Sequence, residues 1–467
     1  MAHPKSTYLI SSTAMFESIS YYIFAGLLVM YMIDVLHFTN PFSTYLFGIA
    51  YGSTYILQII GGYVCDKYLG NRKAIIFGIL FILIAQIIFS YDASLFHLSA
   101  NVQKHSSLLF TYPEIIFLVG ISVMAVGVSF FKVNIASFIN LFYKKDSSLL
   151  DSAFSVFYLF INIGGFLAPL IINMVVGVHH PDLYQYGFLI GAIAMFFGLM
   201  AFILGKNRFF VMPDGEPVGI KPISKTELTE ENKTASKLSK VEIDRLKVVL
   251  IVLVSVLVFQ VFYQQIFTSM ILFAESHVNN TIPFINHKVA PSIYLTLSPL
   301  FVILLSPVYI KIFGSLSNKN KEPSSITKIG VGLVFLGLSF VVLFLAMNNL
   351  GSDNKLGMLW MVSFNFILEN AELLIMPITL SVMTKLSPER FTSSIIGVYY
   401  VTFSIGSIIA GLCASAFPNY HSTMLFHIIP IANLSTYFML FASIGLVIGV
   451  IWLLLKNRII RMANGIL

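Results

Sequence analysis

Charged residues are scarce in this sequence: only 10% of its 467 residues are Asp, Glu, Lys or Arg, whereas soluble globular proteins carry about 25%. Cysteine is also scarce, and Cys65 and Cys413 stand in or beside apolar stretches without metal-ligand spacing. We therefore expect both to be inert packing residues. No nucleophile–base pair and no metal-ligand cluster stands out. These absences argue against a soluble protein and against an enzyme, and they predict no cofactor and no bound metal.

Long apolar runs dominate the chain, with 57% hydrophobic residues and a mean hydropathy of +0.87. Each run of about 18 or more such residues predicts a helix that spans a bilayer. The sequence therefore predicts an all-α membrane protein with the lipid bilayer as a partner. We expect twelve spanning helices, at about residues 11–35, 43–64, 73–91, 113–141, 153–176, 184–204, 247–274, 291–313, 327–347, 356–382, 393–416 and 432–455.

The charges of the loops predict the orientation of these helices. If both termini are cytoplasmic, 24 of the 28 Lys and Arg residues fall on the inner side, and only Lys104, Lys288 and Lys355 fall in outer loops. This asymmetry is what the positive-inside rule demands. The net charge of +7 is thus explained by membrane orientation, and we expect no nucleic-acid partner.

A long polar stretch divides the predicted helices into two sets of six. We expect an N-terminal six-helix bundle at 1–205, a cytoplasmic linker at 206–246 and a C-terminal six-helix bundle at 247–467. Two such halves suggest the pseudo-symmetric major facilitator architecture, in which substrate binds near the bilayer midplane. Composition alone would also allow a channel or a membrane enzyme.

Lys132 is the one strong base that does not lie in or beside a loop. A charge inside the hydrocarbon costs a few kcal/mol or more, so it normally faces a water-filled cavity or an acidic partner. Lys132 is therefore the first candidate for a functional residue, and we expect it to share a cavity with acids from the second half.

The turn between the second and third predicted helices reads GGYVCDKYLGNRKAI. An aspartate followed by a glycine-and-arginine turn is the major facilitator loop pattern. In this interpretation Asp66 accepts hydrogen bonds from a neighbouring helix end, while Gly70 and Arg72 form the turn on the cytoplasmic side. The simpler alternative is a charged inner loop that only obeys the charge rule.

Further blocks make a resemblance specific. The chain resembles the proton-dependent oligopeptide transporter (POT, or peptide transporter) family over nearly its whole length. The blocks, beside the turn, are GVSFFKVNIASFINLFY (127–143), FSVFYLFINIGGFLAPL (154–170), LSPLFVILLSP (297–307), KEPSSITKIGVGLVFLGLSF (321–340) and ENAELLIMPITLSVMTKLSP (369–388). The resemblance implies a secondary transporter of the bacterial inner membrane that moves short peptides or small amine-bearing solutes, with protons as a possible second partner.

The resemblance also implies which residues form the site. In this interpretation Lys132 meets a substrate carboxylate, Glu372 meets an amino group, and Asn162 reads the amide between them. Proton coupling is assigned to Glu17, Lys132 and Glu372. Substrate binding is assigned to Tyr21, Tyr22, Tyr55, Lys132, Tyr158, Asn162, Gln260, Gln264, Ser298, Glu369, Glu372 and Tyr399.

The chain departs from the family pattern E-x-x-E-R-F-x-Y-Y in its first helix. Ala14 and Ser18 replace a glutamate and the arginine, and Ala25 stands where a second arginine usually follows. In the second half, Glu369 stands where the family usually has a neutral residue. Three hypotheses stay open: a proton symporter with rewired coupling, an uncoupled facilitator, and a non-transporting sensor on a transporter scaffold.

A structural interpretation of the buried charges also stays open. Lys132 and Glu17 could form a pair that only holds two helices together. Counting Glu17, Glu369 and Glu372 against Lys132 gives a formal net charge of minus two. This favours a substrate with an amine or net positive character, or a carboxylic acid kept neutral by desolvation.

Overall fold

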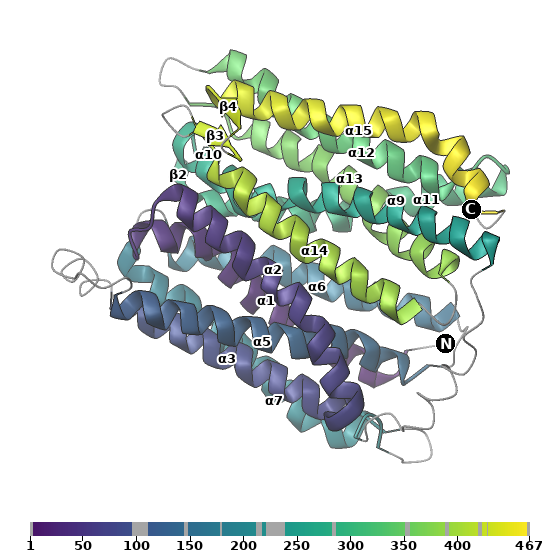
Figure 1. The fold of residues 1–467 in the computed structure, drawn as a ribbon. Coiled ribbons are helices and arrows are strands. Elements are labelled where there is room, and N and C mark those ends of the chain that lie inside the picture. The colour runs from purple at the N-terminus through teal and green to yellow at the C-terminus, as the bar shows by residue number, and fades with distance from the viewer. Residues whose placement is uncertain are drawn as a thin grey trace. The chain divides into compact units, whose positions relative to one another are not determined.

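The structure is a computed structural model that describes residues 3–95, 111–143, 148–177, 180–211, 217–220, 239–282, 286–350, 355–387, 392–418, 423–426 and 428–464. Twelve helices of 22–30 residues account for most of these residues (Figure 1). The predicted all-α architecture is therefore confirmed. Within the described part of the chain, eleven helical spans are long and apolar enough to cross a membrane. The remaining long helix, α2 (Asn40–Val64), is less apolar because Gly, Ser, Thr and Gln residues interrupt its hydrophobic surface.

The chain forms two compact units, Met1–Ser43 with Ser53–Thr229, and Thr44–Gly52 with Glu230–Leu467. The predicted boundaries at 205 and 247, and the cytoplasmic placement of both termini, stay predictions. The long helices of the first unit are α1 (Lys5–Asp34), α2 outside its Thr44–Gly52 segment, α3 (Asn71–Ser94), α5 (Tyr112–Asn140), α6 (Ser148–Val175) and α7 (Tyr184–Phe209), with short turns η1 (Cys65–Leu69) and η2 (Pro181–Leu183).

Glycines bring the helices of the first unit into close contact. α1 packs on α6 and α7, and α3 packs on α5 and α7. A Cβ atom added to Gly78 of α3 would lie 2.7 Å from the backbone nitrogen of Phe131, and one on Gly164 of α6 would lie 2.5 Å from the carbonyl oxygen of Met15. Small residues at such seams allow backbones to approach, which is how helices associate inside a bilayer.

The second unit holds α9 (Lys240–Tyr263), α11 (Leu297–Asn318), α12 (Ser325–Ala346), α13 (Leu359–Leu386), α14 (Thr392–Ser415) and α15 (Leu434–Met462). Between these lie the short helices α10 (Ser269–His277), η3 (Gln264–Phe267), η4 (Pro291–Thr296) and η5 (Met347–Asn349). Two antiparallel hairpins pair β1 (Thr281–Ile282) with β2 (His287–Lys288), and β3 (Thr423–Leu425) with β4 (Ile429–Ile431).

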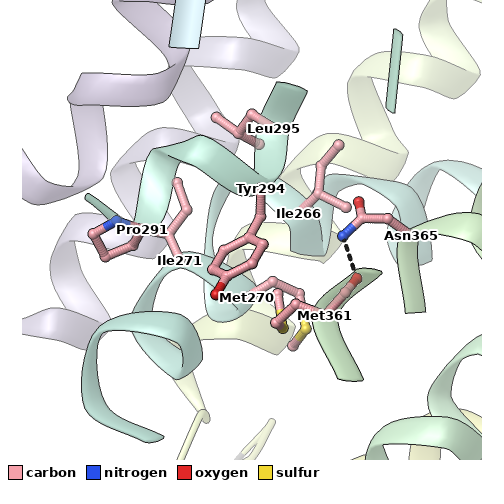
Figure 2. Close-up of a pocket in the computed structure, with 8 residues that line it drawn as sticks. All are labelled: Ile266, Met270, Ile271, Pro291, Tyr294, Leu295, Met361 and Asn365. Atoms are coloured by element: carbon pink, nitrogen blue, oxygen red, sulfur yellow. Dashed lines mark hydrogen bonds between the residues drawn. The ribbon is translucent and has the colours of Figure 1, made fainter. Parts of the chain in front are cut away.

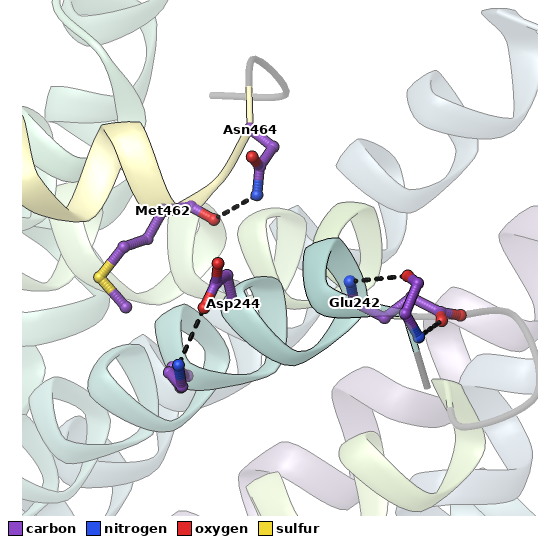
Figure 3. A network of polar contacts seen from close by, with 6 residues as sticks. Glu242, Asp244, Met462 and Asn464 are labelled. Carbon is purple, nitrogen blue, oxygen red and sulfur yellow. Dashed lines mark hydrogen bonds and ion pairs between the residues drawn. The ribbon is translucent and has the colours of Figure 1, made fainter. Parts of the chain in front are cut away.

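The first turn of α9 explains where that helix begins. The Ser239 side chain accepts a hydrogen bond from the backbone nitrogen of Glu242, whose carboxylate binds the backbone nitrogen of Ser239 in return (Figure 3). Such a capping box satisfies amide groups that the helix itself leaves free. One turn further on, Lys247 donates to Asp244 at 2.8 Å.

The structure corrects one predicted helix. The sequence predicts a continuous helix at 247–274, but the segment is divided into α9, η3 and α10. The side-chain oxygen of Gln265 accepts hydrogen bonds from Ser269 at 2.6 Å and from Tyr437 of α15 at 3.0 Å, while its Nε2 donates to the carbonyl oxygen of Ala410 in α14 at 3.2 Å. These bonds hold η3 at the interruption and tie it to two neighbouring helices.

Candidate functional site

Lys132 lies in the C-terminal half of α5, and its amino group meets two side chains of α1. Its Nζ is 3.8 Å from Oε1 of Glu17 and 3.8 Å from the ring centroid of Tyr21. Glu17 and Tyr21 are four residues apart, so they lie on the same face of α1. The ammonium group is therefore held by an opposite charge on one side and by an aromatic face on the other.

Exposure differs sharply between the two members of this ion pair. The side chain of Lys132 is 35% exposed, whereas that of Glu17 is 4% exposed. The 3.8 Å separation is longer than a hydrogen bond, and Oε1 of Glu17 has no hydrogen-bond partner among the described residues. Lys132 thus keeps free donor capacity on its open side, which is the arrangement that a carboxylate ligand requires.

The other predicted polar residues of the first unit lie on α6, α1 and α2. Nδ2 of Asn162 donates to the carbonyl oxygen of Tyr158 at 2.9 Å, so one amide proton is used within α6. Tyr158 is 44% exposed, while Asn162 is buried. On α1 and α2, Tyr22 and Tyr55 are each partly exposed. The assignment of these four residues to a substrate site stays a prediction.

In the second unit, the predicted acids lie on one turn of α13. Glu369 is fully buried, and neither of its carboxylate oxygens has a hydrogen-bond partner in the described structure. The carboxylate of Glu372 and the hydroxyl of Ser298 are its electrostatic neighbours. Tyr399 of α14 is buried and interacts electrostatically with Glu372. The structure therefore brings together four of the predicted residues, Glu369, Glu372, Ser298 and Tyr399.

One member of this group is absent from the sequence prediction. Tyr263, the last residue of α9, shares a hydrogen bond of 2.7 Å with the hydroxyl of Ser298. The packing of α9 on α13 brings this tyrosine to the acids. Its position, three residues after Gln260 in a helix that carried two predicted amides, is the signal that could have indicated it.

The two predicted amides of the seventh segment have different surroundings. Gln260 is buried where α9 meets α14: its Nε2 donates to Ser407 at 3.2 Å, and its stem packs against Gly406. The assignment of Gln260 to a substrate site stays a prediction. Gln264 is 2% exposed, and its side-chain oxygen has no partner within the described residues.

A small cavity of about 10 Å³ lies beside this segment. It is lined mainly by apolar side chains, including Met270, Leu295 and Met361, and Asn365 uses its amide to bind the carbonyl oxygen of Met361 (Figure 2). Such a volume suits about one water molecule. This cavity is therefore too small for a peptide.

The loop motif of the first unit has a specific structural partner. Arg72 is buried, and its guanidinium donates to the carbonyl oxygens of Val218 and Phe210. Gly70 has φ of 74°, and a Cβ atom there would lie 2.7 Å from the carbonyl oxygen of Ile220. The segment that follows α7 is thus fastened to the turn before α3. Asp66 is exposed and makes no ion pair within the described chain.

Comparison with known proteins shows which family this chain resembles. A model of the POT family matches residues 72–221 and 220–429. A di-/tripeptide transporter of Lactococcus lactis subsp. cremoris is 26% identical over 99% of this chain and 97% of its own length.

Two solved structures share the fold. A mutant of the peptide transporter POT in complex with alafosfalin has a TM-score of 0.83 at 22% identity, covering 100% of this chain and 97% of its own. A POT family transporter in complex with 5-aminolevulinic acid has a TM-score of 0.81 at 19% identity, covering 98% of this chain and 97% of its own.

Proposed function

This chain belongs to the POT family, and on that premise we propose that it is a proton-coupled transporter of short peptides or related small amine-bearing solutes. The family resemblance drawn from the sequence blocks is thereby confirmed, as is the major facilitator fold. The chain is a multi-pass membrane protein and a transporter rather than an enzyme. We place it in the bacterial inner membrane because its relatives from Lactococcus lactis and Proteus mirabilis are bacterial proteins.

The chemistry of the two clusters supports this substrate class. A zwitterionic peptide needs a cation for its carboxylate and an anion for its amine. Lys132 offers an ammonium group that is one-third exposed, and Glu372 offers a carboxylate oxygen without a hydrogen-bond partner among the described residues. Because Ala25 stands in place of the second arginine, the carboxylate meets a point charge instead of a two-pronged guanidinium. We therefore expect weaker selection for a free substrate carboxylate.

The single observation that carries the proton coupling is the ion pair of Lys132 with Glu17. Protonation of Glu17 would remove the opposite charge 3.8 Å away and release Lys132 toward a substrate carboxylate. Deprotonation would draw the ammonium group back. Protonation of Glu17 and binding of a substrate carboxylate to Lys132 therefore favour each other, which is the differential interaction that a conformational equilibrium needs.

Uptake of dialanine into proteoliposomes, with and without an imposed pH gradient, tests the proposal. Accumulation above equilibrium is expected when the gradient is imposed. The Lys132→Gln variant should lose this uptake, whereas Lys247→Gln, which removes the exposed partner of Asp244, should keep it. Equilibration without accumulation would replace the proposal with the uncoupled facilitator, a role that the loss of charge at Ala14 and Ser18 favours. No flux of any tested dipeptide would indicate the sensor.

A further inference from the structure

The carboxylates of Glu369 and Glu372 form a pair of acids without a compensating cation in the described structure. They are three residues apart on α13, so their side chains are neighbours on one helix face. Glu369 is 0% exposed, and both of its oxygens as well as Oε2 of Glu372 lack hydrogen-bond partners in the described part of the chain. We propose that Glu369 and Glu372 share one proton and give the second unit a proton-binding site of its own.

The surroundings of the pair favour a shared proton over two negative charges. No described Lys, Arg or His lies within ion-pair distance of either acid. The charged residues nearest along the packed helices α11 and α12 are Lys311, which is exposed, and Lys328, which binds Glu322. The groups that flank the pair are hydroxyls: Ser298 of α11, which neighbours Glu369, Tyr263 of α9, which is hydrogen-bonded to Ser298, and Tyr399 of α14, which interacts with Glu372.

Elementary electrostatics then sets the protonation state. Two carboxylates that share a buried site cannot both ionise, because each charge raises the cost of the other and hydroxyl groups alone do not offset it. The pair therefore holds one proton and one negative charge. Glu369 is the better holder of the proton, because it is the more deeply buried of the two and Glu372 keeps partial exposure.

This inference rests on the proposed function for its consequence in transport. When a substrate ammonium group binds Glu372, that carboxylate must be ionised, so the shared proton resides on Glu369. No other bond changes, and the proton enters from solvent and leaves to solvent. The second unit then carries one proton together with one ammonium group, which leaves the acid pair electrically neutral. Glu369 then becomes a positioning residue for the charge on Glu372.

Infrared spectroscopy of the purified protein tests the pair without requiring transport. The wild type should show the carbonyl band of protonated carboxyl groups at neutral pH, and the difference spectrum against Glu369→Gln should show the loss of one such group. In Glu372→Gln the band should persist but titrate at lower pH, with a proton affinity reduced by at least about tenfold, because the like charge is gone. The control Glu275→Gln, on α10, should leave the band unchanged.

Three results would overturn the inference. One is a wild-type spectrum that shows no protonated carboxyl sensitive to Glu369→Gln. Another is an unchanged titration in Glu372→Gln, which would show that burial alone keeps Glu369 neutral. The third is a change of the same size in Glu275→Gln. Should Glu369→Gln fail to fold, the titration of Glu372→Gln against the wild type decides alone. A failure of dialanine uptake with these bands intact would contradict the proposed function and leave the proton pair standing.

Discussion

Removal of the Arg72 side chain should release the segment after α7 from the first unit. Arg72 donates through Nε to the carbonyl oxygen of Val218 at 2.5 Å and through Nη2 to that of Phe210, and its guanidinium lies 5.7 Å from the Phe210 ring centroid. Its own backbone nitrogen donates to the carbonyl oxygen of Gly219 at 3.0 Å. Only the side-chain bonds are lost on mutation, so their contribution can be isolated.

The loss of local stability in Arg72→Ala can be calculated from the number and kind of hydrogen bonds that are removed. A hydrogen bond to a charged group contributes about 1.5–3 kcal/mol, and Arg72→Ala removes two of them. Water that enters the vacated space recovers part of this, so we expect local unfolding to become easier by about 3 kcal/mol. Lysine cannot reproduce a planar fork that reaches two carbonyl groups. Arg72→Lys should therefore cost about half as much.

Cys65 provides the assay, because it is buried immediately before the turn and its carbonyl oxygen accepts a hydrogen bond from the backbone nitrogen of Gly70 at 2.8 Å. In a Cys413→Ala background, labelling of Cys65 by a thiol reagent reports local opening. About 3 kcal/mol corresponds to labelling roughly 150-fold faster in Arg72→Ala, and about 1.5 kcal/mol to roughly tenfold in Arg72→Lys.

Two controls make the result decisive. Arg208→Ala removes a guanidinium that lies over the Phe209 ring near the end of α7, and it should leave the labelling rate of Cys65 unchanged. In the reverse background, Cys65→Ala, labelling of Cys413 should not respond to Arg72→Ala. Equal labelling of Cys65 in the wild type and in Arg72→Ala would refute the reasoning, as would an equal loss in the alanine and lysine variants.

Three further outcomes are expected from thermal unfolding in detergent. Gly78→Ala should destabilise the protein by about 1–3 kcal/mol because its Cβ would press on the α5 backbone, whereas Gly314→Ala, with no atom within 4 Å, should be neutral or stabilising; equal effects would contradict this account. Tyr437→Phe should cost about 1–3 kcal/mol because two buried hydrogen bonds of 3.0 and 3.3 Å are lost, and an unchanged unfolding temperature would argue against them. The hydrogen bond from Lys328 lowers the pKa of Glu322, so this pair stabilises the fold above the ordinary glutamate pKa and stops doing so as the pH falls through the lowered pKa. Glu322→Gln should thus match the wild type at acid pH and unfold slightly earlier at neutral pH; the reverse order would be inconsistent with the bond.

Most of the helical architecture could be predicted from local properties of the chain. A run of apolar residues long enough to cross the hydrocarbon must satisfy its backbone groups internally, so it forms a helix wherever it occurs. The interruption at Gln264–Phe267 could not be predicted this way, because the sequence there contains no Gly or Pro. It depends in part on the hydrogen bond that the hydroxyl of Tyr437, 172 residues away, donates to the side-chain oxygen of Gln265.

Some residues of the candidate site could likewise be predicted from the sequence, and others could not. Lys132 could be identified from sequence because a lone charge in an apolar helix is costly wherever the helix packs. Its neighbours Glu17 and Tyr21 lie more than a hundred residues earlier, and only the family resemblance could assign them to the same site. Tyr263 was missed, since nothing local distinguishes a tyrosine that reaches Ser298 from one that packs against apolar neighbours.

The sequence by itself therefore determined that this is a helical membrane protein, how many long helices it has, and which residue carries an unavoidable electrostatic cost. Those properties depend on composition and spacing along one helix. Only the tertiary structure decided that Gln260 lies buried where α9 meets α14, that Arg72 fastens the segment after α7, and that Glu369 is buried with no cation within ion-pair distance among the described residues. The physical reason is that burial and pairing depend on which helix faces meet, and that arrangement is set by contacts between residues far apart in the chain.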